Sequence, residues 1–332
     1  MRRGSGFLMN GTASACMLIS GLALLVPGVS AQTPTYPVKP IRLIIGFTPG
    51  GASDLVARVY APRLSAALGQ QVLVENRPGA NGIIARNIVA KAPPDGHTLT
   101  LISPSTLVLN SVVEATPFDV ARDFAPVARI VDLQNILITH PSLPARDLRE
   151  FIRLAKAQPG KLNYATSGVG GAGHLAAQLL STMAGIDLVH VPYRGGSIAI
   201  NDLLAGHVDS FMAIISTAVP HVQSGKARAI AVSGARRSSA LPDVPTMAQS
   251  GLTGYDATTW YGFVVPAGTP NPIIQRLYKE IIAITNDQAI RQHLESRGIE
   301  AFPAAPEVFA AYIKAETPKW TRLVQAAGVK AE

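Results

Sequence analysis

Short apolar runs alternate with amphipathic segments along most of the chain. Ile41–Phe47 is rich in β-branched and aromatic residues, which predicts a buried strand. Ser53–Leu68 carries apolar residues at helical spacing before Gly69, which predicts a helix that ends there. The same reasoning predicts further strands at 71–75, 98–103, 136–139, 162–165, 188–191, 208–215, 229–233 and 260–266, and further helices at 83–92, 147–157, 174–184, 198–204, 218–224, 272–285 and 305–327. This alternation is typical of an α/β fold with a mostly parallel sheet covered by helices on both faces.

The chain is long for one such sheet, so we expect two lobes that form a clamshell, each with its own mostly parallel sheet flanked by helices. The crossings between lobes are expected near Asp132–Gln134 and Gly254–Thr258. This places residues 32–133 and 256–332 in the first lobe and residues 134–255 in the second.

The N-terminus has the three-part layout of a secretory signal peptide. Arg2 and Arg3 precede the uncharged apolar stretch Ala15–Val26, and small residues lead to Ala31. A membrane anchor is the alternative, but the apolar stretch is short for a span of about 20 residues. We therefore expect residues 1–31 to be removed after Ala31. The single cysteine, Cys16, lies inside this leader, so the exported chain would have no disulfide and no thiolate site.

The charge of the chain excludes one class of partner. Without Arg2 and Arg3, 27 basic residues face 21 acidic ones, and the basic residues are scattered rather than clustered. Nucleic-acid binding would need a concentrated basic patch, so no nucleic-acid partner is expected. A mildly positive surface would still favour small anions.

Two glycine-rich loops, each between a predicted strand and a predicted helix, are the candidate binding elements. The first glycine loop contributes Phe47, Thr48, Gly50, Gly51, Ala52, Ser53 and Asp54, and the second contributes Thr166, Ser167, Gly168, Gly170 and Gly171. Glycine lets the backbone turn tightly and present its N–H groups. The helix that follows adds unpaired N–H groups and a partial positive charge, which bind a carboxylate or phosphate. In open α/β sheets, ligands bind beyond the carboxyl ends of strands, so the two loops could face one cleft.

Three titratable residues near these loops have more than one interpretation. Ser53 or Asp54 could cap the first helix, and Asp54 fits a helix start better than a general base. His174 could line the cleft or pack at its own helix start. Asp209, at the beginning of a predicted strand, could be a cleft or hinge residue or an ordinary turn residue.

No enzyme signature is convincing. Gly168, Gly170 and Gly173 match the G-x-G-x-x-G dinucleotide motif, with Asp187 downstream, but the motif lies mid-chain in an exported protein. A dinucleotide-dependent oxidoreductase is therefore a weak alternative. The sequence has no G-x-S-x-G elbow, no P-loop and no legible set of metal-ligating histidines, so we expect no catalytic residue, no cofactor and no metal.

The chain resembles the Bug, or TctC-like, family of extracytoplasmic solute-binding proteins, which serve tripartite tricarboxylate transporters. The resemblance covers essentially the whole exported chain and rests on the segments 36–42, 47–58, 75–82, 91–99, 163–175, 191–196, 206–209 and 265–270. It implies a periplasmic clamshell that closes on a carboxylate held by the two loops, and a membrane permease as partner. A monomer is expected. Gly46, Thr48, Gly171 and Ala213 depart from residues frequent in the family. A sensor that presents its ligand to a signalling protein remains an alternative, because it would need the same clamshell.

Overall fold

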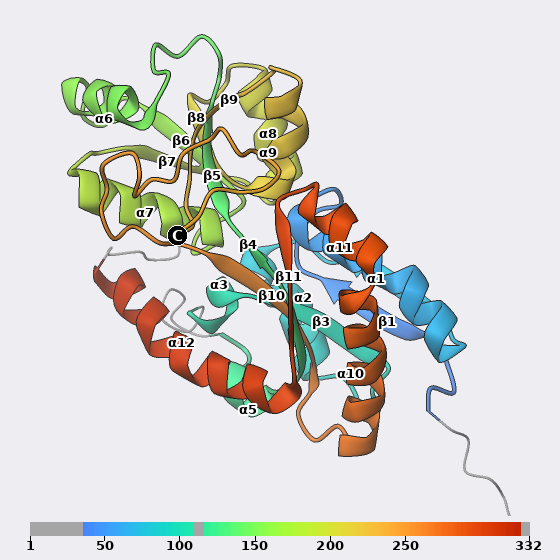
Figure 1. Ribbon diagram of the computed structural model, residues 1–332. Coiled ribbons are helices and arrows are strands. Elements are labelled where there is room, and N and C mark those ends of the chain that lie inside the picture. The colour runs from blue at the N-terminus through green and yellow to red at the C-terminus, as the bar shows by residue number, and fades with distance from the viewer. Residues whose placement is uncertain (1–35, 109–115, 327–332) are drawn as a thin grey trace, which may run out of the picture. The chain divides into compact units, whose positions relative to one another are not determined.

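The computed structural model describes residues 36–108 and 116–326, which form one compact unit with two β-sheets (Figure 1). The predicted signal peptide lies outside the described residues. The six-stranded sheet has the order β11-β4-β10-β3-β1-β2, and the five-stranded sheet has the order β7-β6-β8-β5-β9.

The six-stranded sheet begins with a β-α-β-α-β unit. Its elements are β1 (Ile41–Ile45), α1 (Ala52–Leu68), β2 (Val72–Asn76), the 3₁₀ turn η1 (Ala80–Gly82), α2 (Ile83–Ala90) and β3 (Thr98–Ile102). β1 lies between β2 and β3 and is parallel to both. The short helices α3 (Pro104–Leu107) and α5 (Val120–Asp123) precede β4 (Phe124–Leu133).

The five-stranded sheet contains a second unit of the same kind. After β5 (Asn135–Thr139) and α6 (Leu148–Ala157), the unit runs through β6 (Asn163–Thr166), α7 (Ala172–Ala184), β7 (Val189–Pro192), α8 (Gly196–Leu204) and β8 (Ser210–Ile214). β6 lies between β7 and β8 and is parallel to both, as β1 is to its neighbours. The two glycine loops therefore follow equivalent strands, β1 and β6. α9 (Ile215–Gln223) and β9 (Arg228–Val232) complete this part.

The chain then returns to the first sheet. β10 (Thr259–Pro266) inserts between β3 and β4 and is antiparallel to both, and β11 (Ile299–Ala304) pairs antiparallel with β4 at the edge. The helices of this return are α10 (Asn271–Asn286), α11 (Gln288–Glu295) and α12 (Pro306–Ala326).

The two-lobed α/β fold is confirmed, but the prediction of mostly parallel sheets was wrong. Both sheets are mixed, because β10 returns antiparallel into the first sheet and β5 is antiparallel to both of its neighbours. β4, β11 and α11 were not predicted. The chain passes between sheets at Gln134 and returns between β9 and β10. We propose that the lobe boundaries follow these crossings, with residues 32–133 and 256–332 in one lobe and 134–255 in the other.

Each sheet is covered by helices on both faces. Buried apolar side chains of α1, α10 and α11 pack on one face of the first sheet, and those of α2, α3 and α12 pack on the other (Figure 1). In the second sheet, α6 and α7 share one core and α8 and α9 share the other. Burial of these apolar faces is the main source of stability.

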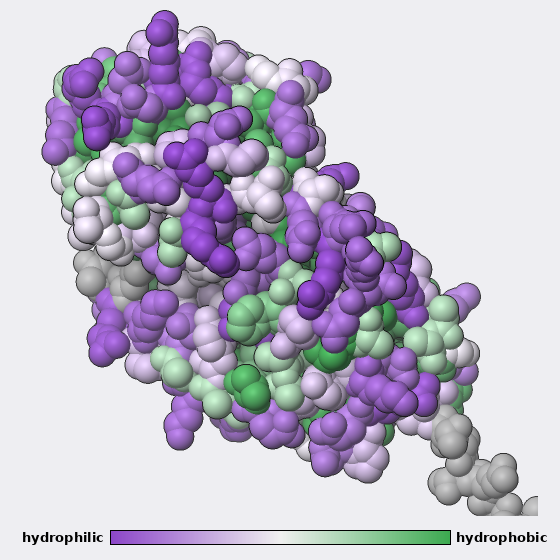
Figure 2. Space-filling model, in the orientation of Figure 1, coloured by the Kyte–Doolittle hydropathy of each residue, from purple (hydrophilic) through white to green (hydrophobic). Residues whose placement is uncertain are grey.

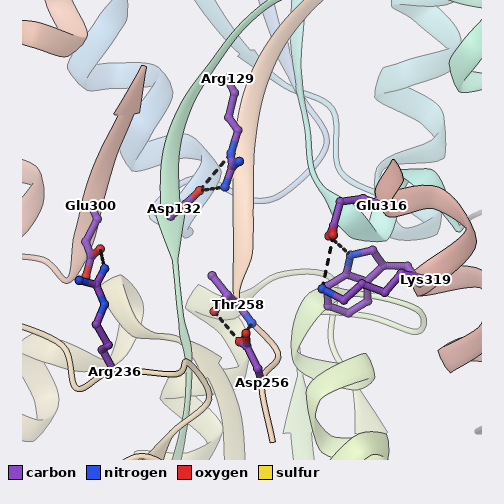
Figure 3. A network of polar contacts seen from close by, with 9 residues as sticks. Arg129, Asp132, Arg236, Asp256, Thr258, Glu300, Glu316 and Lys319 are labelled. Atoms are coloured by element: carbon purple, nitrogen blue, oxygen red, sulfur yellow. Dashed lines mark hydrogen bonds and ion pairs between the residues drawn. The ribbon is translucent and has the colours of Figure 1, made fainter. Parts of the chain in front are cut away.

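Polar contacts gather where the chain crosses between the sheets (Figure 3). Arg129 forms an ion pair with Asp132 on β4, and its guanidinium lies 3.9 Å and 4.0 Å from the ring centres of Phe302 and Tyr312. Nearby, Arg236, which follows β9, lies 3.4 Å from Glu300 on β11. The Arg236–Glu300 pair is exposed, so it contributes little to stability.

The surface is predominantly hydrophilic on the face that Figure 2 displays, with small apolar areas between charged side chains. Among residues 36–108 and 116–326, no helix is long and apolar enough to cross a membrane. Over the same residues, no group of three or more His, Cys, Asp or Glu side chains is placed to hold a metal ion.

Candidate ligand-binding site

The first glycine loop connects β1 to α1 in a tight turn. Gly50 has a φ of 80°, in the left-handed region that favours glycine, and the Gly51 amide donates to the Thr48 carbonyl at 3.4 Å. Gly51 is the N-cap of α1, and no side chain caps this helix. The expectation that Ser53 or Asp54 would be the N-cap was therefore wrong, because the helix begins one residue before Ser53.

Asp54 instead holds the loop from inside the first helical turn. Its carboxylate accepts hydrogen bonds from the Gly50 amide, Arg58 Nε and Asn76 Nδ2, each at 2.9 Å. Asn76 Nδ2 also donates to the Phe47 carbonyl at 3.0 Å. Burial alone would raise the pKa of Asp54, but these hydrogen bonds outweigh it and lower the pKa below its usual range. Because its hydrogen bonds tie together Gly50, Arg58 and Asn76, this carboxylate is a positioning group for the loop.

The second glycine loop repeats this backbone pattern 120 residues later. Gly170 has a φ of 72°, the Gly171 amide donates to the Gly168 carbonyl at 3.2 Å, and Gly171 is the N-cap of α7. The Gly170 amide donates to His174 Nδ1 at 2.9 Å, as the Gly50 amide does to Asp54. The imidazole of His174 thus takes the place of a carboxylate.

Two stacked histidines support the second loop. The rings of His174 and His190 lie 4.0 Å apart, and His190 Nε2 lies 2.7 Å from Thr166 Oγ1, which accepts from the Gly168 amide. Burial, and to a smaller extent His190, lowers the pKa of His174 to about 3, and burial lowers the pKa of His190 to about 4. Both rings are therefore neutral near pH 7, and a neutral Nδ1 can accept the Gly170 hydrogen bond.

A cavity lies between the two loops and is lined from both sheets. Within residues 36–108 and 116–326, its walls carry no acidic or basic side chain: they are Phe47, Gly51, Ala52, Ser53, Ser103, Ser105, Ser167, Ala172, Gly196, Phe211, Ile214, Thr217, Thr259 and Tyr261. These include the N-cap or first-turn residues of the longer helices α1, α7, α8 and α9. First-turn N–H groups have no partner within a helix and carry partial positive charge. The glycine amides bond within their own loops, so the helix starts are the free backbone donors.

Some polar atoms beside the cavity lack a hydrogen bond. Thr259 Oγ1, in the cavity wall, is buried with no partner among the described residues. Asn81, in the η1 turn, has both amide atoms buried and likewise unpartnered there. Native proteins leave few buried polar atoms unsatisfied, so these atoms indicate a place for water or ligand.

One hydrogen bond joins the first loop to the other sheet. Thr48 Oγ1 and Ser197 Oγ, on α8, lie 2.9 Å apart. A side chain on Gly195 would overlap Thr48 Oγ1, so this approach needs a glycine there. The contact brings the starts of α1 and α8 together beside the cavity.

The structure brings most of the predicted site residues together, with differing roles. Phe47, Gly51, Ala52, Ser53 and Ser167 line the cavity. The remaining loop residues and His174 shape the loops behind it: Thr48, Gly50, Asp54, Thr166, Gly168, Gly170 and Gly171.

Asp209, which was also predicted to be a site residue, lies away from the two glycine loops. Its Oδ2 accepts from the Asn163 amide at 2.9 Å, and its own amide donates to Asn163 Oδ1 at 2.8 Å. Asn163 begins β6, whereas the second loop follows the other end of that strand. Asp209 joins the starts of β6 and β8, and we withdraw it from the site.

The sequence matches the tripartite tricarboxylate transporter family receptor, TctC, over residues 56–329. The chain belongs to this family. BugT of Bordetella pertussis is 33% identical over 318 residues, which cover 95% of this chain and 98% of BugT.

Two solved structures are similar to this chain in sequence and fold. A protein of Rhodopseudomonas palustris, solved with adipate, is 33% identical with a TM-score of 0.86, and covers 88% of this chain and 98% of its own. MatC of the same organism, solved with bound malate, is 31% identical with a TM-score of 0.83, and covers 87% of this chain and 100% of its own.

Receptors of the TctC family are periplasmic solute-binding proteins and not enzymes. The oxidoreductase alternative is therefore wrong. The structure gives Gly173, the last glycine of the dinucleotide-like motif, a packing role, since a Cβ atom there would overlap the carbonyl oxygen of Met212 on β8. Glycine allows α7 to approach the sheet closely.

Several cavity residues of this TctC receptor were missed from the sequence. Ser103, Ser105, Ile214 and Thr217 lie at or beyond the ends of predicted strands, so the argument used for the two loops could have found them. Gly196 belongs to a segment that carried the family resemblance. Thr259 and Tyr261 gave no such signal, because they enter from the start of the antiparallel strand β10.

Proposed function

We propose that this receptor captures a small carboxylate in the cavity between the two glycine loops and delivers it to the membrane subunits of a tripartite tricarboxylate transporter. The observation that carries the proposal is the convergence of α1, α7, α8 and α9 on a cavity whose lining, among the described residues, has no acidic side chain. Four helix starts supply N–H donors and partial positive charge, which select an anion.

The lining also fits a carboxylate rather than a purely apolar ligand. Ser53, Ser103, Ser105, Ser167 and Thr217 offer hydroxyl groups, while Phe47, Phe211 and Ile214 offer apolar contacts for a carbon chain. The relatives solved with adipate and malate show that this fold accommodates ligands of that chemistry.

The receptor reaches its ligand as an exported monomer in this proposal. The leader, residues 1–31, is cleaved after Ala31, so the mature protein starts at Gln32 in the periplasm. The partner is a membrane permease of the transporter, which receives the loaded receptor.

Thermal unfolding with charge-matched ligands tests the proposal. Adipate, malate and succinate would each be compared with the corresponding diamide. A ligand that binds only the folded state stabilises it by about 2.7 kcal/mol at a hundredfold excess over Kd. At least one carboxylate should therefore raise Tm by several degrees and its diamide should not. Equal shifts with the diamide, or no shift with any carboxylate, would contradict the proposal.

A matched pair of variants locates the site. Thr259→Val removes the unpartnered cavity hydroxyl, so it should preserve or raise the stability of the free protein while lowering carboxylate affinity. Thr100→Val is the control, because Thr100 donates to the Ile44 carbonyl at 2.7 Å inside the sheet. It should lower stability and leave affinity unchanged. If Thr259→Val left affinity unchanged, the ligand would bind elsewhere.

A further inference from the structure

Arg86, on α2, is a buried cation without an anionic partner among the described residues. It is 3% exposed, and its one hydrogen bond runs from Nη1 to the Asn81 carbonyl at 2.9 Å. Its Nε is buried and unpartnered in the described structure. Burial lowers the pKa of this guanidinium to about 10, which leaves it charged at pH 7. Burying an uncompensated charge is costly, so the fold retains this group at an energetic disadvantage.

Arg129, the other strongly buried arginine among the described residues, has the compensation that Arg86 lacks. It is 5% exposed, but it pairs with Asp132 and lies over the rings of Phe302 and Tyr312. Among the residues that the structure describes, no acidic side chain pairs with Arg86 and no aromatic ring lies under its guanidinium. The Arg86 charge therefore lacks, within the described structure, the compensation that Asp132 gives to Arg129.

Asn81 extends the unusual environment of Arg86 toward the second glycine loop. Asn81 adopts φ 49° and ψ 36°, a left-handed conformation that is uncommon for a residue other than glycine. A Cβ atom on Gly168 or on Gly171 would lie 3.5 Å from Asn81 Oδ1. The unpartnered amide therefore lies against the loop that carries the cavity residue Ser167.

The Arg86 guanidinium itself lies behind the first glycine loop. It packs so closely on Gly82 that a side chain there would overlap Nη1, and Gly82 in turn packs on Gly46, which precedes the cavity residue Phe47. Arg86 also interacts electrostatically with Tyr261 in the cavity wall, where its charge opposes the effect of burial on the Tyr261 pKa.

We propose that Asn81 and Arg86 form a second anion-recognition unit, which selects ligands that carry two carboxylates. This rests on the proposed function. The helix starts hold the first carboxylate, the Asn81 amide donates to the second, and the Arg86 charge balances it. Asn81 is the contacting residue, and Arg86 acts by charge and by holding the Asn81 carbonyl. The receptor then discriminates by ligand charge as well as by shape.

Calorimetric titration with ligand pairs of matched length tests this. Adipate, succinate and malate would be compared with hexanoate, butyrate and 3-hydroxybutyrate. Wild type should bind a dicarboxylate at least tenfold more tightly than its matched monocarboxylate. Arg86→Met and Asn81→Gly should each lower dicarboxylate affinity about tenfold or more and leave monocarboxylate affinity within about twofold.

Stability measurements accompany the titrations. Arg86→Met removes an unpaired buried charge and Asn81→Gly relieves a left-handed backbone, so neither should lower Tm. Arg42→Met is the control, since Arg42 forms a part-exposed pair with Glu75 on the same sheet at 2.7 Å, and it should bind all ligands as wild type does.

The alternative outcomes are distinguishable. Equal losses of affinity for both ligands of a pair would show that Asn81 and Arg86 only shape the loop, and unchanged dicarboxylate affinity would remove them from the site. Either result, or a wild type that prefers monocarboxylates, overturns this inference and leaves the proposed function intact. A wild type that binds none of the six carboxylates overturns both.

Discussion

The two glycine loops share one backbone design but are held by different chemistry. Gly50 to Leu55 and Gly170 to Leu175 read G-G-A-S-D-L and G-G-A-G-H-L. In both loops the first of these glycines donates its amide to the side chain four residues on, which is a carboxylate in Asp54 and a neutral imidazole in His174. The backbone geometry is thus what both loops have in common, and the side-chain acceptor is exchangeable.

The surroundings of the two acceptors differ accordingly. The Asp54 carboxylate needs Arg58 and Asn76 as additional donors, because a buried carboxylate must be compensated. His174 needs no counterion and instead stacks on His190, which stacks on Tyr164 at 4.9 Å. The comparison predicts that the second loop depends more on packing and on pH than the first.

The largest expected difference between the two loops is in the stability lost when the residue before the side-chain acceptor, Gly173 or Ser53, is replaced. Gly173→Ser would drive a Cβ atom into the Met212 carbonyl, which the backbone of α7 and β8 cannot easily avoid. We expect a loss of about 3 kcal/mol in the free energy of unfolding. The equivalent exchange in the first loop, Ser53→Gly, should cost about 1 kcal/mol or less. Urea denaturation measures both, and similar losses would contradict the packing difference.

The second expected difference is in how the contributions of His174 and Asp54 to the free energy of unfolding depend on pH. His174 has a folded pKa of about 3 against about 6.5 in an unfolded chain, so the unfolded state binds the proton first. Its stabilising contribution is therefore complete above pH 6.5 and declines as the pH falls toward 3. Between pH 7 and pH 5 the expected loss is on the order of 1–2 kcal/mol. Asp54, whose folded pKa is also lowered, contributes fully above the unfolded value of about 3.9 and should be insensitive in this window.

A histidine variant separates the two loops. His174→Asn keeps an acceptor near the Gly170 amide but removes the titrating ring. Urea denaturation at pH 7 and pH 5 should show a smaller loss for this variant than for wild type. The partly exposed His221, whose pKa is lowered by burial and by Lys226, remains in both proteins and cancels in the comparison. His190 loses its stacked neighbour in the variant, which reduces the burial that lowers its pKa and so adds to the expected decrease in pH dependence. Identical pH dependence would show that His174 does not titrate as described.

The fold was predictable wherever a strand was continuously apolar. β1, β5 and β10 were found within a few residues for that reason. β4 was not, because Pro126, Arg129 and Asp132 interrupt its apolar pattern. The two charges neutralise each other there, and Phe302 and Tyr312 cover Arg129. A sequence window cannot contain that compensation, since Tyr312 comes from a helix 183 residues after Arg129.

The sequence allowed the backbone of the two loops to be predicted, but not the roles of the side chains in the site. Glycine spacing located both loops, because tight turns before helices leave a local signature. The roles of the side chains depended on distant partners: Asp54 on Asn76, and Asp209 on Asn163, 46 residues away. Asn81 and Arg86 gave no local signal either, because an unpaired buried charge becomes visible only when its neighbours are known.

The smallest expected difference is in the carboxylate affinity lost when one hydroxyl is removed from each loop. Thr48 Oγ1 bonds to Ser197 Oγ within the protein, so Thr48→Val should change carboxylate affinity by twofold or less, about 0.4 kcal/mol. Ser167 lines the cavity, so its hydroxyl is placed to reach the ligand. Ser167→Ala should therefore weaken binding by about 0.5–1.5 kcal/mol, the value of a neutral hydrogen bond. Calorimetry with a carboxylate that wild type binds measures both changes. A larger effect for Thr48→Val would mean that the contact between the first loop and α8, rather than the hydroxyl of the second loop, limits affinity.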